Sequence, residues 1–284
     1  MFNATGILID AFIEDLAQRY RQLFPSADAA YGEAAVAVAR MALSRVARSD
    51  ALFHGVEHTM NVAHVGQDIM AGLLVRDGRL TTVEWLHFTA ASVCFALGFL
   101  RDVCEGDGRR RCRIDGNGGS IDLPIGVTDG FLWPHAANRA MLFVEKFFRD
   151  HLLIDGAKVA SLVDYTRFPP PADRQHDTAT LSGLVRAAHY IGAIADPNFL
   201  LKLKPLFLEL KECGLAQKLG YGSVVELRLG YPKLYWSTMY PLTRDGAELL
   251  TFTPTGRQWL ANMYAQLLLE EHAGKADSGM ASPG

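Results

Sequence analysis

The stretch "SVCFALGFLR", residues 92–101, decides the fold, because it is apolar at nearly every step. It belongs to a longer apolar segment, residues 82–102, whose pattern predicts a helix. A helix that is apolar all round its circumference is buried on every side. We therefore expect residues 82–102 to form a central helix, with the other helices of the protein packed around it.

Most of the remaining chain also shows the apolar spacing of amphipathic helices. The predicted helices cover residues 5–23, 30–48, 56–75, 82–102, 134–151, 156–165, 180–195, 197–213 and 254–272. Glycine, aspartate and proline crowd residues 105–130, which predicts a long loop. The pattern indicates an all-α fold, a single-domain helical bundle. We expect residues 1–50 to pack as N-terminal helices on a core of residues 51–272, and residues 273–284 to form a disordered tail.

Composition and charge argue against several classes of protein. Hydrophobic residues make up 49% and charged residues 21% of the 284 residues, as in soluble globular proteins. The formal net charge of -3 does not favour a nucleic-acid partner. No uncharged run reaches the ~18 residues needed to span a bilayer. The N-terminus carries no basic leader, and the four cysteines include no C-x-x-C pair. We therefore expect a reduced, cytoplasmic protein with no membrane and no nucleic-acid partner.

Two histidines at the start of a predicted helix suggest a ligand site. His54 and His58 are four residues apart, which places both on one face of a helix. This spacing suits two ligands of one metal ion, although such a pair alone is weak evidence. Two acids further along the chain, Glu209 and Glu212, are interpreted as a solvated helix face.

Four segments carry a resemblance to a known family. They are "FHGVEHTMNVAHVGQDIM" (53–70), "SVCFALGFLRDVC" (92–104), "YTRFPPP" (165–171) and "LVRAAHYIGAIADPNFLLKLKPLFLEL" (184–210). In this order they resemble a bacterial subgroup of the HD-domain superfamily, the PDEase-like metal-dependent phosphohydrolases. The resemblance covers about residues 50–265. It implies an HD-domain-like helical bundle, and a metal site in which one histidine, a His-Asp pair and a late aspartate hold a divalent ion.

The metal-ligand positions of that family are only partly kept. The first histidine matches His58, the His-Asp pair matches Phe95 and Ala96, and the late aspartate matches His189. His135 resembles a subgroup histidine that could serve a second metal ion. Because Phe95 and Ala96 cannot bind a metal, the resemblance implies that the family's metal–water hydrolysis is lost.

Three interpretations of the altered pocket stay open. The histidines His54, His58, His135 and His189 could be core residues that only satisfy hydrogen bonds. They could line a pocket for a small ligand, with Arg139 or Arg186 nearby. Alternatively, three of them could form a new site for zinc, iron or a haem-type cofactor, made of His58, His135 and His189.

The sequence therefore favours a degenerate HD-domain protein, a pseudoenzyme with no cofactor, that acts by binding a small molecule or a protein partner in a regulatory role. A homodimer is expected. The alternative is an enzyme, either a divergent metal-dependent phosphohydrolase or one that uses a rebuilt histidine site. The proposed pocket comprises His54, His58, Phe95, Ala96, His135, Arg139, Arg186 and His189.

Overall fold

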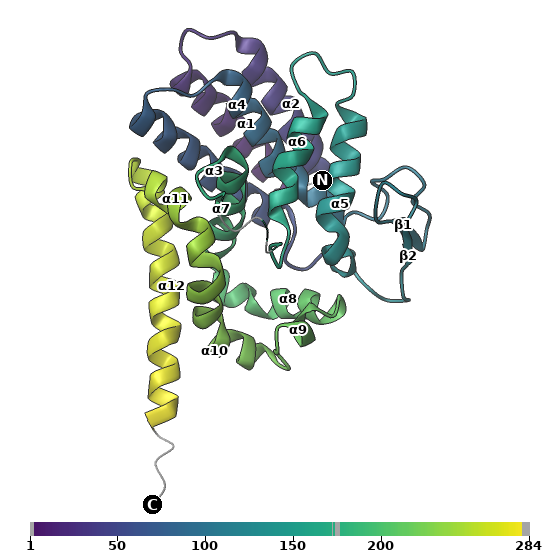
Figure 1. Ribbon diagram of the computed structural model, residues 1–284, viewed down its shortest axis with the longest axis vertical. Helices are drawn as coiled ribbons and strands as arrows, with labels where there is room; N and C mark the ends of the chain where they lie inside the picture. Colours follow the sequence, from purple (N-terminus) through teal and green to yellow (C-terminus); the bar gives the residue numbers. More distant parts are fainter. Residues whose placement is uncertain (1–2, 172, 174–176, 280–284) are drawn as a thin grey trace, which may run out of the picture.

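The computed structural model describes residues 3–171, 173 and 177–279, and it is built almost entirely of helices (Figure 1). The all-α prediction is confirmed. The α-helices are α1 Ala4–Leu23, α2 Ala29–Val46, α3 Val56–Asp77, α4 Thr82–Cys94, α5 Trp133–Phe147, α6 Gly156–Val163, α7 Leu181–Ile194, α8 Phe199–Glu212, α9 Leu215–Lys218, α10 Val224–Leu234, α11 Tyr240–Leu250 and α12 Pro254–Gly279.

Helix α4 is the central element. Every residue from Trp85 to Cys94 is buried, and α2, α3, α6 and α7 pack around this helix. A capping box between Thr81 and Glu84 fixes its start. By length and composition alone the segment Thr82–Phe99 could cross a membrane, but 83% of it is buried inside the protein. The core helix of a soluble protein has the same character, so the fold is compatible with a soluble protein.

The predicted helix over residues 82–102 is wrong in its second half. The α-helix ends at Cys94, and a 3-10 helix, Phe95–Phe99, follows it. Here the chain passes so close to α5 that a Cβ on Gly98 would lie 1.8 Å from a backbone oxygen. The buried Arg139 of α5 donates to the carbonyl of Gly98 at 2.9 Å and to that of Leu100. In a continued α-helix these carbonyls would accept hydrogen bonds from backbone N–H groups of the next turn. Here the Arg139 side chain binds them instead.

A buried carboxylate joins the N-terminal helices to the core and to the last helix. Asp68 of α3 accepts hydrogen bonds from Arg19 of α1 at 3.0 Å, and from Thr255 and Trp259 of α12 at 2.7 and 2.9 Å. Its surroundings pair one negative charge with one positive charge and two neutral donors, as a buried charge requires. Helix α12 also packs against α7, α10 and α11 before its end extends past the other helices (Figure 1).

The predicted loop over residues 105–130 contains a short antiparallel hairpin, β1 Arg111–Arg113 with β2 Ser120–Asp122 (Figure 1). It is followed by a 3-10 helix, Asp129–Leu132. At the other end of the chain, α12 continues beyond residue 272 to Gly279. Residues 280–284 of the predicted tail, and residues 172 and 174–176 of the proline-rich segment, lie outside the described residues.

Three helices between residues 214 and 253 were not predicted. They are α9, α10 and α11, and a π-helical turn, Tyr235–Met239, joins the last two. Pro232 lies inside α10, and Pro241 lies in the first turn of α11. These prolines interrupt the apolar periodicity, which is why the pattern alone did not reveal the helices.

Helices α3 and α7 approach each other closely at a glycine. A Cβ added to Gly192 of α7 would lie 2.7 Å from the Cα of Val62 in α3. Gly192 is one turn from His189, and Val62 is one turn from His58. The close approach therefore brings these two histidines together.

Replacing Gly192 with alanine tests this contact. In an unobstructed helix the change would stabilise the protein by about 1 kcal/mol. Here the backbone of α3 blocks the new methyl group, so we expect the free energy of unfolding to fall by about 1–3 kcal/mol. Urea unfolding measures it. Gly108→Ala is the control, because its Cβ would meet nothing nearer than 3.8 Å. A more stable Gly192→Ala protein would contradict the close contact.

Candidate metal centre

Three buried histidines converge at the centre of the bundle. They are His54, just before α3, His58 in its first turn, and His189 in α7. One ring nitrogen from each lies within 4.8 Å of those of the other two. The ring centre of His58 lies 5.0 Å from that of His54 and 5.6 Å from that of His189. This is a set of nitrogen donors of the kind that binds a single transition-metal ion.

His54 is held in place by a buried carboxylate from a distant helix. Its Nδ1 lies 2.6 Å from Oε2 of Glu209 in α8, while Oε1 accepts from the backbone N–H of Phe53 at 2.6 Å and of His54 at 3.2 Å. The prediction that His54 shares a helical face with His58 is wrong, because α3 begins only at Val56. Glu209 positions His54 instead.

The Glu209 pair sets the chemistry of the His54 ring. Burial acts to raise the pKa of Glu209, but the adjacent His54 and the N–H donors outweigh it and lower that pKa. The carboxylate is therefore ionised, and it accepts a hydrogen bond from the protonated Nδ1 of His54. In a neutral imidazole this leaves Nε2 as the lone-pair nitrogen, free to bind a ligand.

The other two histidines present nitrogens that the protein itself does not satisfy. Nε2 of His58 and Nδ1 of His189 are buried and have no hydrogen-bond partner among the described residues. Burial and the neighbouring His54 and His189 hold the pKa of His58 well below its usual range. Burial, with His54, lowers the pKa of His189 to about 3. Both rings are therefore neutral near pH 7, the form in which imidazole binds metal.

Aromatic rings surround the three histidines. Phe99 stacks on His54 with ring centres 4.2 Å apart, and Trp133 meets the same ring at 4.4 Å. Phe95 stands edge-on to His189 at 4.7 Å and to His58 at 5.9 Å. Its ring packs against both histidines, and Ala96 is buried in the hydrophobic core. These contacts from the 3-10 helix and the start of α5 hold the histidine rings in place.

The other predicted pocket residues lie elsewhere. His135 is half-buried near the start of α5 and is not part of the histidine cluster, so His54 takes its place in the trio. Arg139 is bound to Asp107 at 2.9 Å and to backbone carbonyls, and it holds the loop after the 3-10 helix. Arg186 lies with its guanidinium carbon 5.4 Å from the ring centre of Tyr165, and it does not line the cavity beside the histidines that is described below. None of the three faces the trio.

An apolar cavity of about 70 Å³ opens beside the trio. All three histidines line it, together with side chains from α7, α8, α10 and the π-helical turn. A second cavity, of about 250 Å³, shares Trp133, Phe168 and His189 with the first, and Arg167 and Lys218 lie in its wall. The histidine trio is therefore accessible from a space that could hold a ligand.

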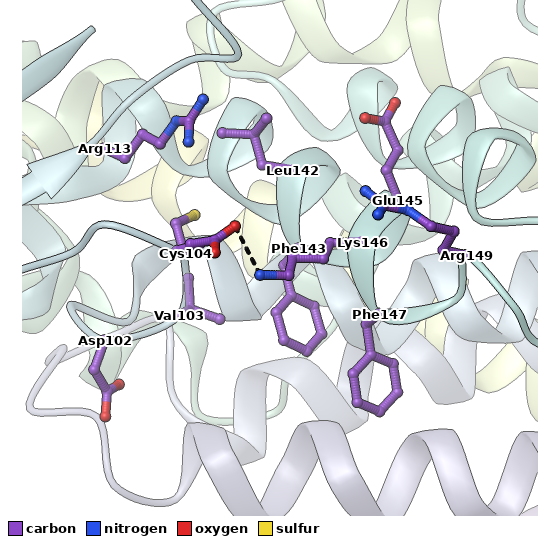
Figure 2. Close-up of a pocket in the computed structure, with 11 residues that line it drawn as sticks. Asp102, Val103, Cys104, Arg113, Leu142, Phe143, Glu145, Lys146, Phe147 and Arg149 are labelled. Atoms are coloured by element: carbon purple, nitrogen blue, oxygen red, sulfur yellow. Dashed lines mark ion pairs between the residues drawn. The ribbon is translucent and has the colours of Figure 1, made fainter. Parts of the chain in front are cut away.

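A larger cleft of about 730 Å³ lies away from the histidines, between α5 and the segment after the 3-10 helix (Figure 2). Its lining mixes both signs of charge, and Lys146 is already paired with Glu105 at 2.7 Å, the dashed line in Figure 2. Arg113 and Arg149 point toward it from opposite sides (Figure 2). This cleft shows no convergent set of groups comparable to the trio.

Sequence reasoning missed Glu209 and the aromatic shell. The prediction that Glu209 lies on a solvated face is wrong, since its side chain is fully buried. Glu212 is half-buried and accepts the N–H and hydroxyl of Thr128 at 2.6 Å each. The available signal was the apolar company of Glu209 in "LFLEL", residues 206–210, because a carboxylate among core residues requires a buried partner.

The lowered histidine pKa values predict a pH dependence of stability. The unfolded chain binds a proton at His189 below its ordinary pKa of about 6.5, whereas the folded protein does so only near about 3. Stability should therefore fall as the pH drops below 6.5, by about 1.4 kcal/mol per pH unit for each such histidine. His189→Leu should flatten this slope between pH 6 and 5, as measured by urea unfolding. An unchanged slope would contradict the neutral, buried state of His189.

No curated protein and no solved structure matches this chain. A family model does match it, over residues 2–273, and its description is Npun_R2479-like. The match spans the N-terminal helices, the histidine trio and most of α12. The chain belongs to the Npun_R2479-like family.

Proposed function

We propose that this chain is an HD-domain-like metal-binding protein that holds a divalent transition-metal ion through His54, His58 and His189. The observation that carries the proposal is the convergence of three buried imidazoles, one of them fixed by Glu209. The buried nitrogens of His58 and His189 have no hydrogen-bond partner among the described residues. A bound ion would remove the cost of leaving these nitrogens unsatisfied.

The donor set favours zinc or another transition metal over magnesium. Neutral imidazoles suit zinc, copper, iron and nickel, whereas magnesium prefers carboxylate and water oxygens. Glu209 supplies the only negative charge in direct contact with the trio in the described part of the chain, and it acts through His54. We do not extend the proposal to haem, because a cavity of about 70 Å³ is far smaller than a macrocycle.

Comparison with the HD-domain pattern supports a binding role over phosphohydrolysis. His58 and His189 occupy two of the family's metal-ligand positions, but Phe95 and Ala96 replace its His-Asp pair. The site thereby loses the carboxylates that hold a magnesium-type ion in such enzymes. A protein that binds a small ligand at its metal, in the cytoplasm, is the function that this arrangement supports best.

The chain's own residues perform three tasks in this function. Glu209 holds the proton on Nδ1 of His54, so that Nε2 stays available. Phe95, Phe99 and Trp133 pack against the histidine rings and limit their movement. The cavity beside the trio admits the ligand. When bound, the metal supplies a Lewis-acidic centre, and three protein donors leave coordination positions for water or a ligand.

Metal content of the purified protein tests the proposal, and Glu209→Gln sharpens it. An amide cannot accept from all three N–H groups as the carboxylate does, and its NH₂ would face Nδ1 and force the proton onto Nε2. We expect about one equivalent of zinc in the native protein, and a 10–100-fold weaker zinc affinity in Glu209→Gln.

Glu212→Gln is the matched control, because it removes a charge one turn away that holds only Thr128. Its zinc affinity should equal that of the native protein. His58→Ala and His189→Ala should lose the metal while remaining folded by circular dichroism. Native protein that takes up no transition metal in dialysis against zinc, cobalt or iron would contradict the proposed function.

Restoring the metal ligands of the HD-domain pattern tests the HD-domain resemblance separately. The triple variant Phe95→His, Ala96→Asp, His189→Asp would present two histidines, His58 and the one introduced at position 95, and two aspartates. His54 would remain beside them. We expect its preference to move from zinc toward manganese or magnesium, because carboxylate oxygens replace nitrogen. Competition dialysis measures this preference. His189→Asp alone is the control, and a folded triple variant with no such shift would contradict the alignment of Phe95 and Ala96 with the His-Asp pair.

A further inference from the structure

The cavity beside the trio carries almost no charge. Among the residues that line it in the described part of the chain, none is an aspartate, glutamate, lysine or arginine. Apart from the histidines and two tyrosines, its walls are alanine, leucine, isoleucine, methionine, phenylalanine and tryptophan side chains. An ionised group placed among these walls, away from the metal, would lose its hydration without gaining a partner charge. The cavity walls therefore favour an uncharged ligand body.

One of the two tyrosines has an unused hydroxyl. Tyr190 donates to the carbonyl of Arg167 at 3.0 Å, so its hydroxyl is satisfied. The Tyr231 side chain is only 3% exposed, and its hydroxyl has no hydrogen-bond partner among the described residues. Buried hydroxyls are normally paired, and leaving one unpaired costs about 1–3 kcal/mol. Tyr231 thus offers a second polar contact to whatever enters the cavity.

The volume limits the size of that ligand. A cavity of about 70 Å³ is roughly half that of the engineered cavity of ~150 Å³ that binds benzene. A compact group of a few heavy atoms fits, and a nucleotide does not.

We propose that the site takes a small uncharged ligand, with an apolar body in this cavity, one donor atom directed to the metal at the histidine trio, and a second polar atom bonded to the Tyr231 hydroxyl. The proposal rests on the metal site proposed above. It predicts a ligand class different from phosphate esters, whose charge the cavity walls do not match. The cations Arg167 and Lys218 line the neighbouring cavity, not this one.

Cobalt-loaded protein provides the test, since the visible spectrum of cobalt responds when its ligands change. Pyrazole is the probe, an uncharged five-membered ring with one coordinating nitrogen and one N–H. Inorganic phosphate is the charged comparison. We expect pyrazole to change the spectrum saturably, and phosphate to leave it unchanged at the same concentrations.

Three variants locate the probe. Tyr231→Phe should weaken pyrazole binding about three- to tenfold, the effect of one hydrogen bond. Tyr221→Phe, which loses a hydroxyl outside the cavity lining, should bind pyrazole like the native protein. Ala193→Leu fills the cavity and should abolish pyrazole binding with the cobalt content unchanged.

The outcomes separate the two proposals. A protein that binds no cobalt overturns the metal site itself. A cobalt protein whose spectrum responds to phosphate and not to pyrazole overturns the uncharged-ligand inference and leaves the metal site intact. Equal pyrazole affinity in Tyr231→Phe and the native protein overturns the second polar contact.

Discussion

The hydrogen-bonded pair of Glu209 and His54 is the interaction on which the site depends. A fully buried carboxylate is tolerable only when its charge is compensated, and here two backbone N–H groups and the His54 ring provide that compensation. Removing one partner of such a buried pair typically costs about 3–5 kcal/mol. The pair fixes the His54 ring just before α3, and it determines which nitrogen of that ring keeps a lone pair.

The other two histidines of the centre, His58 and His189, lie in surroundings without charged side chains in direct contact among the described residues. His58 and His189 stay neutral because burial disfavours their protonated forms. The aromatic rings packed around them add no hydrogen bonds and no charge. Gly192 allows α3 and α7 to approach closely enough for the two rings to share one space. Polar histidines in an apolar shell are costly unless something binds them, which is why we assign them a ligand.

Much of the helical architecture could be read from the sequence, because apolar periodicity reports directly which faces are buried. The central position of α4 followed from its uniform apolarity. The sequence also singled out His58 and His189, which the structure brings together with His54. The pattern could not reveal the 3-10 helix at Phe95, which depends on a carbonyl clamp from Arg139. Nor could it reveal that His54, not His135, completes the trio. Glu209 was misjudged because a lone acid on a helix is usually solvated, and only its tertiary partner explains its burial.

The contact between Glu209 and His54 also has a consequence for the order of folding. The two residues are 155 positions apart, so α8 must dock before His54 acquires its fixed orientation. Contacts of such long range form late, since the loop between them must first be closed. The trio is thus completed only after most of the chain has collapsed. An ion captured at full affinity would then mark a molecule that has finished folding, and its release would be an early sign that α8 has detached.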